Sequence, residues 1–119
     1  MERKFLMKAR EILDSRGNPT VEAEILIDEQ KIRAIAPSGA STGKHEALEL
    51  RDKDNRFHGK GVIKAVKNVD KIYNAIKNSD LKNQRLVDEK ILSLDGTKNK
   101  TNLGANATIA ASMACLRAG

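Results

Sequence analysis

Cysteine and aromatic residues are scarce in this chain of 119 residues. The single cysteine, Cys115, cannot form an internal disulfide, which excludes a disulfide-stapled scaffold and favours a reducing, cytoplasmic location. Because it stands among alanines, we expect a buried structural thiol rather than a reactive nucleophile. Tryptophan is absent, and the scattered Phe5, Phe57 and Tyr73 offer no stacking platform for single-stranded nucleic acid. The net charge of +6 therefore does not by itself indicate specific nucleic-acid binding.

Long apolar runs are also missing. The least charged stretch, residues 103–116, is shorter than the roughly 20 residues that span a bilayer, and polar side chains interrupt it. The first seven residues carry charge but no apolar core of the kind that a signal peptide has. We therefore expect neither membrane insertion nor secretion by the classical route.

Side chains that could bind a metal ion are either few or interleaved with basic residues. Only two histidines are present, His45 and His58, too few for a typical zinc site without cysteine partners and with no local signal of a catalytic triad. Four carboxylates, Glu46, Glu49, Asp52 and Asp54, could form a metal cluster. Their alternation with basic residues favours a solvated, ion-paired helix end instead; these residues are Lys44, Arg51, Lys53 and Arg56.

The sequence does contain a clear change in the spacing of its apolar residues, from strand-like to helix-like. Alternating apolar and polar residues predict strands over Thr20–Ile27 and Lys31–Ala36, with an earlier strand at about Lys4–Leu13. Turn residues separate them at Ser15–Pro19 and at Asp28–Gln30. The chain length fits one domain, so these strands predict a three-stranded antiparallel meander.

Helical spacing follows the strands. We predict about four helices, at Glu46–Arg51, Gly61–Lys77, Asp80–Leu94 and Gly104–Ala118, which makes the domain α+β. We expect the third of these helices to end at Asp95-Gly96. Its inward-facing side chains are expected to be Leu86, Val87, Ile91 and Leu94. The last is rich in alanine, which permits close packing, with Ile109, Met113 and Leu116 as its larger side chains.

The predicted helix over residues 61–77 has two distinct faces. Its apolar face carries Val62, Val66, Val69, Tyr73 and Ile76. A second face carries Lys64, Lys67 and Lys71, which indicates a solvated surface or, alternatively, a contact for an acidic partner.

The segment Pro37–Glu46 is the most informative for chemistry. Two glycines, Gly39 and Gly43, bracket the hydroxyl residues Ser41 and Thr42. Glycine allows a loop to fold over a ligand, and Ser41 offers a carbonyl and a hydroxyl as hard oxygen donors. The segment is not a Walker A motif, because too few residues separate its glycines and His45 stands where a Ser or Thr would meet magnesium.

A second motif runs from Asp14 to Pro19. Its composition suffices for a simple turn, in which Asp and Ser side chains bind local backbone, Gly17 permits a positive φ and Pro19 starts the next strand. The same turn could also hold Arg16 against a partner domain.

Together these motifs resemble the amino-terminal domain of enolases. The similarity covers nearly the whole chain and is carried by Leu13–Glu22, Leu94–Lys100, Leu103–Ala107 and above all the loop Ser38, Gly39, Ala40, Ser41, Thr42 and Gly43, followed by His45-Glu46-Ala47. The sequence departs from the family pattern at Thr108–Ser112, where the family usually reads Ile-Leu-Gly-Val-Ser, and the loop before Lys31 looks short.

The resemblance implies an activity that the chain would share with a larger barrel domain. Enolases interconvert 2-phosphoglycerate with phosphoenolpyruvate and water in glycolysis and gluconeogenesis, with two Mg²⁺ ions per active site and with the proton-transfer residues on the barrel. Residues 1–119 would then be the N-terminal domain without its end and without the barrel, so we expect the chain alone to be inactive. By resemblance the loop Ser38–Gly43 closes over substrate and Ser41 binds the second magnesium.

Two further residues match family positions at the dimer contact. There the amino-terminal sheet of one subunit meets the barrel of the other, and the matching residues are Arg10 and Glu22, although either could be a plain surface ion. An alternative function is a non-catalytic, enolase-derived binding module that uses the lysine face.

Overall fold

The computed structural model describes residues 4–36, 50–53, 55–59, 61–96 and 103–118. In chain order it contains β1 (Leu6–Leu13), β2 (Pro19–Ile27), β3 (Gln30–Ile35), a short 3₁₀ helix η1 (Arg56–Gly59), α1 (Ile63–Ile76), α2 (Gln84–Asp95) and α3 (Ala105–Ala118). Strands come first and helices follow, so the predicted α+β class is confirmed.

The three strands form an antiparallel sheet in the order β1-β2-β3, as predicted. In the first turn the carboxylate of Asp14 accepts hydrogen bonds from the backbone N–H groups of Arg16 (2.8 Å) and Asn18 (2.9 Å). Gly17 lies at φ +77°, a conformation that favours glycine. The predicted turn is therefore confirmed at Asp14 and Gly17, and Pro19 starts the next strand as predicted.

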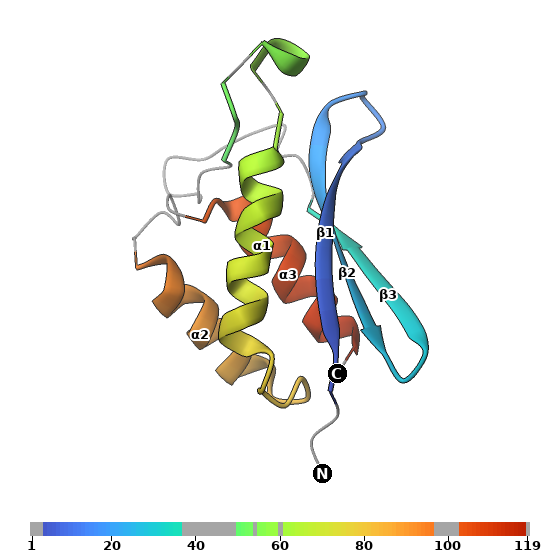
Figure 1. Ribbon diagram of the computed structural model, residues 1–119, viewed down its shortest axis with the longest axis vertical. Coiled ribbons are helices and arrows are strands. Elements are labelled where there is room, and N and C mark those ends of the chain that lie inside the picture. Colours follow the sequence, from blue (N-terminus) through green and yellow to red (C-terminus); the bar gives the residue numbers. More distant parts are fainter. Residues whose placement is uncertain (1–3, 37–49, 54, 60, 97–102, 119) are drawn as a thin grey trace.

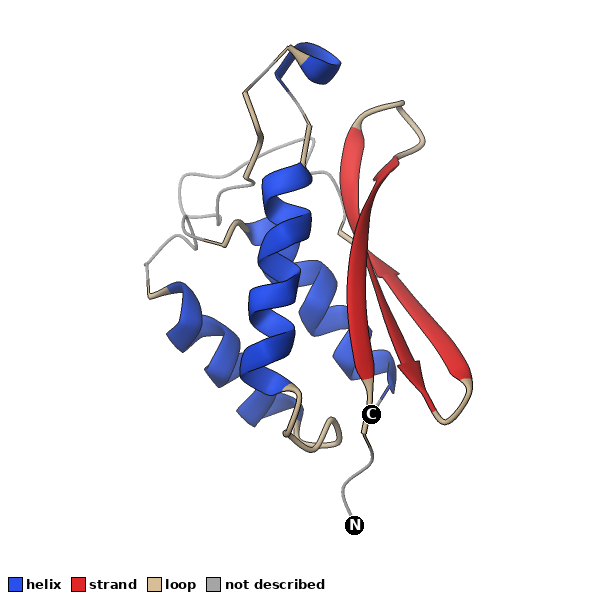
Figure 2. Cartoon of the chain, in the orientation of Figure 1, coloured by secondary structure: helices blue, strands red, loops and turns tan. Residues whose placement is uncertain are grey.

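All three α-helices lie on one side of the sheet (Figure 1, Figure 2). Helix α1 packs against β1, and α3 packs against β2 and β3. Helix α2 packs against α1 and α3 and forms the outer edge of the helical layer. The other face of the sheet carries none of the three helices.

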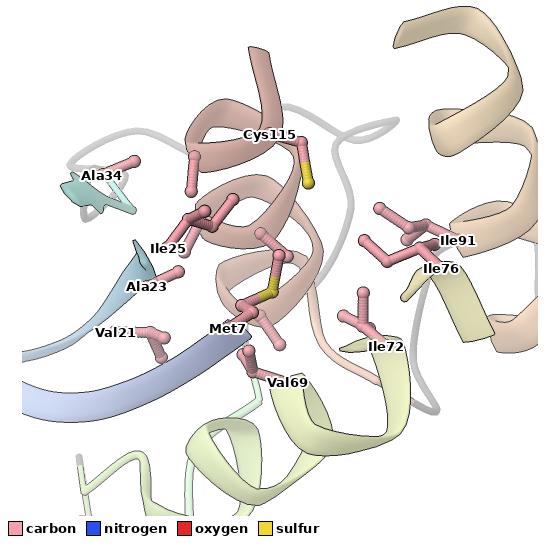
Figure 3. Close-up of a cluster of buried hydrophobic side chains, with 14 of the residues drawn as sticks. Met7, Val21, Ala23, Ile25, Ala34, Val69, Ile72, Ile76, Ile91 and Cys115 are labelled. Atoms are coloured by element: carbon pink, nitrogen blue, oxygen red, sulfur yellow. The ribbon is translucent and has the colours of Figure 1, made fainter. Parts of the chain in front are cut away.

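The core fills the space between sheet and helices (Figure 3). Met7, Val21 and Ile25 of the sheet lie in the same buried cluster as Val69 and Ile72 of α1. Small alanine side chains let α3 lie close to the sheet. Every one of its described alanines is buried, namely Ala105, Ala107, Ala110, Ala111, Ala114 and Ala118. The predicted packing of this helix is confirmed.

Two predictions about the helices are wrong. The described residues contain three α-helices rather than about four. Most of the predicted helix at 46–51 lies outside the described residues, and its described positions Leu50 and Arg51 are not helical. In α2 the buried stripe is narrow, Val87, Ile91 and Asp95, so the leucines beside it, Leu86 and Leu94, are each 40% exposed rather than inward.

Candidate functional site

The predicted loop Ser38–Gly43, including the proposed magnesium ligand Ser41, lies outside the described residues. The structure does describe the residues on either side of segment 37–49, Ala36 and Leu50, which we call its departure point and its return point. The contacts of these two positions therefore define how the loop is attached.

The departure point is fixed by the start of β2. The backbone N–H of Ala36 donates to the carbonyl of Val21 at 2.9 Å, beyond the last residue of β3. The hydroxyl of Thr20 donates to the carbonyl of Ala36 at 2.6 Å, and Thr20 is only 2% exposed. Both backbone groups of Ala36 are thus bonded in a buried environment, which fixes the position of the chain there.

The return point is fixed by the start of α3. The backbone N–H of Leu50 donates to Asn106 Oδ1 at 3.1 Å, and Asn106 Nδ2 donates to the carbonyl of Leu50 at 3.0 Å. Asn106 is 3% exposed. The next residue, Arg51, donates from Nη1 to the carbonyl of Pro19 at 2.5 Å, which links the return point to β2 as well. We call the contacting residues Pro19, Thr20, Val21, Ala36, Leu50, Arg51 and Asn106 the loop base.

Gly104 is required for this arrangement. It lies at φ +89°, and a Cβ atom added there would sit 2.5 Å from Leu50 Cβ and 2.7 Å from Asn106 Oδ1. No side chain fits at that distance, so glycine allows Leu50 to approach α3.

A second polar cluster holds the start of α1. The two carboxylate oxygens of Asp52 accept from the backbone N–H groups of Ile63 (2.8 Å) and Lys64 (3.0 Å), and Glu11 Oε2 accepts from Val62 N–H at 2.8 Å. These N–H groups lack partners within the helix, and negative charge at a helix N-terminus is favourable. Asp52 is therefore a helix cap supplied from the segment that follows the loop.

The outer face of the sheet presents a network of alternating charges. Arg10 and Glu22 are direct cross-strand partners of β1 and β2, and Arg10 Nε donates to Glu22 Oε1 at 2.6 Å. Arg33 Nε of β3 donates to Glu24 Oε2 at 2.9 Å and lies 4.0 Å from Glu22 Oε1. The hydrogen bond from Arg33 lowers the pKa of Glu24. The two residues predicted for a dimer contact thus bind each other within one chain.

The other candidate metal ligands and the lysine face are taken in turn. Glu46, Glu49, Asp54 and His45 lie outside the described residues. Asp52 caps α1, and no group of three His, Cys, Asp or Glu side chains in the described part of the chain could hold a metal ion. The predicted lysine face is confirmed as exposed at Lys64, Lys67 and Lys71.

Cys115 is buried and free, as predicted. Burial, and secondarily the negative charge of Asp88, raises the pKa of its thiol to about 12. A thiol with such a pKa stays protonated near neutral pH and is a poor nucleophile. This supports a structural role.

Sequence reasoning missed the roles of Thr20, Asp52 and Asn106. Leu103–Ala107 stands out in the sequence as a motif, but nothing in it shows that Asn106 would bind the backbone of a residue 56 positions earlier. The available signal was the Gly-Ala-Asn triplet itself, since a buried amide must find hydrogen-bond partners.

Within the described residues, none of the helices is both long enough and apolar enough to cross a membrane.

The fold and these motifs correspond to a known class of domain. A family model described as the enolase N-terminal domain matches residues 6–119. The chain belongs to the enolase family.

Individual relatives agree with this assignment. The chain is similar to the enolase of Campylobacter jejuni subsp. doylei, with 58% identity over 114 residues, which is 94% of this chain and 28% of the relative. It is 57% identical to the enolase of Campylobacter lari over 94% of this chain and 28% of the relative. The enolase of Elusimicrobium minutum is 56% identical over 93% of this chain and 26% of its own length. The chain thus spans about a quarter of the length of these curated relatives.

Proposed function

We propose that this chain supplies the N-terminal domain of an enolase that interconverts 2-phosphoglycerate with phosphoenolpyruvate and water in the cytoplasm, as a step of glycolysis and gluconeogenesis. The observation that carries the proposal is the family match over residues 6–119. Because the chain spans about a quarter of its relatives, we assign the proton-transfer residues to a barrel domain, in the same chain or in a separate one. By itself the chain is then expected to be inactive.

In the proposed enzyme the segment Ser38–Gly43 closes over bound substrate and excludes water from the reacting centre. Its glycines and hydroxyl residues suit that task, and the loop base supports it, because a loop can close reproducibly only if both ends are held.

Ser41 is the residue of this chain proposed to hold a magnesium ion. Its hydroxyl and carbonyl oxygens are hard donors of the kind that Mg²⁺ prefers, so the donor chemistry fits the ion. When bound, the ion would stabilise negative charge that develops on the substrate carboxylate. Two such ions would serve each active site of the complete enzyme.

The outer face of the sheet is the proposed contact with the barrel of a second subunit. Arg10 and Glu22 lie on this face, which none of the three helices covers. The side chain of Arg10 is 59% exposed although it binds Glu22, so its guanidinium can reach a further acceptor.

A hybrid enolase tests the proposed role of Ser41. In this hybrid the matched residues of the present chain replace those of the C. jejuni relative, to which they are 58% identical. We expect Ser41→Ala to raise the Mg²⁺ concentration needed for half-maximal phosphoenolpyruvate formation about tenfold or more, because a direct oxygen ligand is lost.

The matched control is Ser93→Ala, which removes the same hydroxyl from an exposed position on α2. It should leave the Mg²⁺ dependence unchanged. An equal Mg²⁺ dependence in Ser41→Ala and the unmodified hybrid would remove Ser41 from the proposed site.

A further inference from the structure

We infer that the groove between α1 and α2, together with the lysine face beside it, binds an acidic amphipathic helix of a partner protein. This interaction goes beyond the proposed enzymatic function, because it uses none of the residues proposed above for magnesium binding or for subunit contact.

The lysine face of α1 carries positive charge that the other described residues do not neutralise. Lys64, Lys67 and Lys71 are all exposed, and none of the three forms an ion pair or a side-chain hydrogen bond with another described residue. Lysines at positions i, i+3 and i+7 lie on one side of a helix, over a length of about 10 Å. Asp70 is the acidic residue of α1, so three lysines against one aspartate leave this helix with a net charge of +2.

A groove with exposed apolar side chains runs between α1 and α2, which pack against each other (Figure 1). Its volume is about 580 Å³, and it is lined by Ala75, Leu86, Glu89, Lys90, Ser93 and Leu94. Leu86 and Leu94 are each 40% exposed, so part of their apolar surface is available to a ligand.

The groove and the lysine face belong to one surface. Side-chain direction turns by about 100° per residue in a helix, so Ala75 lies within about 40° of both Lys64 and Lys71 around α1. Ala75 lines the groove, and Lys71 precedes it by one helical turn. A ligand in the groove would therefore have the lysine side chains along one edge.

The charged residues of the groove itself do not reverse this positive charge. Glu89 Oε1 lies 3.3 Å from Arg85 Nε, one turn earlier on α2, so a cation already stands beside this carboxylate. Lys90 Nζ donates to Ser79 Oγ at 2.7 Å, and a neutral hydroxyl leaves the charge of the lysine in place. The groove thus combines apolar side chains with a basic edge.

An amphipathic helix with acidic side chains along one flank matches this combination. Such a helix can lay its apolar face into a groove. Carboxylates at i, i+3 and i+7 repeat the spacing of the three lysines, so several ion pairs can form in register. Single-stranded nucleic acid is a poorer match, because no aromatic side chain among the described residues lines the groove to stack on its bases.

Titration of the isotope-labelled present chain with synthetic peptides, followed by NMR, tests the interaction. The probe is a peptide of about 18 residues, long enough to form a helix, with a leucine stripe and glutamates along one flank. The control peptide has lysine in place of each glutamate. We expect the acidic peptide to shift amide resonances of α1 and α2 and to bind at least about tenfold more tightly than the control. Equal binding of the two peptides, or none by either, would overturn the inference.

A charge reversal locates the basic edge. Lys71→Glu should raise the Kd of the acidic peptide about fivefold or more. The matched control is Lys31→Glu, which makes the same change at an exposed position of β3 and should leave the Kd within about twofold. Equal effects of the two variants would show that only the overall charge of the chain matters.

A leucine truncation locates the groove. Leu86→Ala should raise the Kd about threefold or more, because it removes exposed apolar surface from the groove. Leu92→Ala is the control, since Leu92 is 50% exposed on the same helix but lines a different groove, between α2 and α3. Equal effects of the two truncations would remove the α1–α2 groove from the binding site.

Two further outcomes would give this surface another role and contradict the inference. A single-stranded oligouridylate that binds α1 and α2 as tightly as the acidic peptide, with Leu86→Ala affecting neither ligand, would indicate a general polyanion surface. The folded hybrid enolase should bind the acidic peptide as the present chain does. Loss of binding in the hybrid alone would mean that the rest of the enzyme covers the groove.

Discussion

Arg10 and Glu22 face each other across β1 and β2, joined by a hydrogen-bonded ion pair of 2.6 Å between Nε and Oε1. The pair is asymmetric, since the Glu22 side chain is 9% exposed and that of Arg10 is 59% exposed. The side chain of Glu22 is therefore almost fully covered within the sheet. The exposed guanidinium of Arg10 can bind an additional acceptor from another molecule.

This asymmetry predicts the effect of Arg10→Ala on assembly. If the outer face of the sheet meets a second subunit, the variant of the hybrid enolase should dissociate with a Kd about tenfold higher, which sedimentation analysis would measure. Its melting temperature should fall only modestly, because Arg10 is mostly exposed and Arg33 still lies 4.0 Å from Glu22 Oε1. Arg85→Ala is the control, since Arg85 forms an exposed pair with Glu89 on α2, away from the sheet. Equal dissociation constants for the two variants would count against the contact.

Gly104→Ala should destabilise the domain more than Gly17→Ala. Both glycines have positive φ, so each substitution costs roughly 1–2 kcal/mol of backbone strain. Only Gly104 has atoms nearby, with Leu50 Cβ at 2.5 Å from an added Cβ, whereas nothing lies within 4 Å at Gly17. Overpacking should add about 1–3 kcal/mol at Gly104. Urea unfolding measures both, and equal losses would mean that Leu50 is not held against α3.

Asp52→Asn should weaken the start of α1. Asp52 accepts from the N–H groups of Ile63 and Lys64, and its side chain is 5% exposed. Removing the negative charge while keeping the shape should cost about 1 kcal/mol. Asp70→Asn, at an exposed position on the same helix, should cost much less. The difference in urea midpoint between the variants tests the cap, and no difference would rule it out.

The buried thiol predicts a loss of stability at high pH. The folded state raises the pKa of Cys115 from about 9 to about 12, so the folded protein holds this proton more tightly than the unfolded chain does. Its stabilising effect is complete below about pH 9 and is lost progressively as pH rises toward 12, by up to about 1.4 kcal/mol per pH unit.

Because other groups of a protein also change charge at high pH, the comparison is with Cys115→Ala. The free energy of unfolding of the original chain should fall more steeply with pH than that of the variant. Parallel curves would show that the thiol is not buried as described.

β1 and α1 follow directly from the sequence, because their buried positions recur with a period of about two and about 3.6. β2 was also expected, from the alternation of its residues, although nearly all of them are buried in the structure. Leu86 and Leu94 could not be placed in the same way. They flank the stripe of Val87 and Ile91, and only the positions of α1 and α3 decide how wide that stripe is.

The loop base was beyond sequence reasoning for a different reason. Thr20 and Ala36 are 16 positions apart, and Leu50 and Asn106 are 56 apart, so their bonds depend on the assembled fold. Composition indicated that Ser38–Gly43 is a functional segment, but nothing local indicated which residues hold its ends.

The most direct test of the proposed function is the rate of phosphoenolpyruvate formation from 2-phosphoglycerate and Mg²⁺ by three samples. These are the present chain, the separately expressed remainder of the C. jejuni relative beyond the matched region, and the two mixed. We predict activity in the mixture alone. Activity of the remainder that the present chain does not increase, or activity of the present chain by itself, would contradict the account.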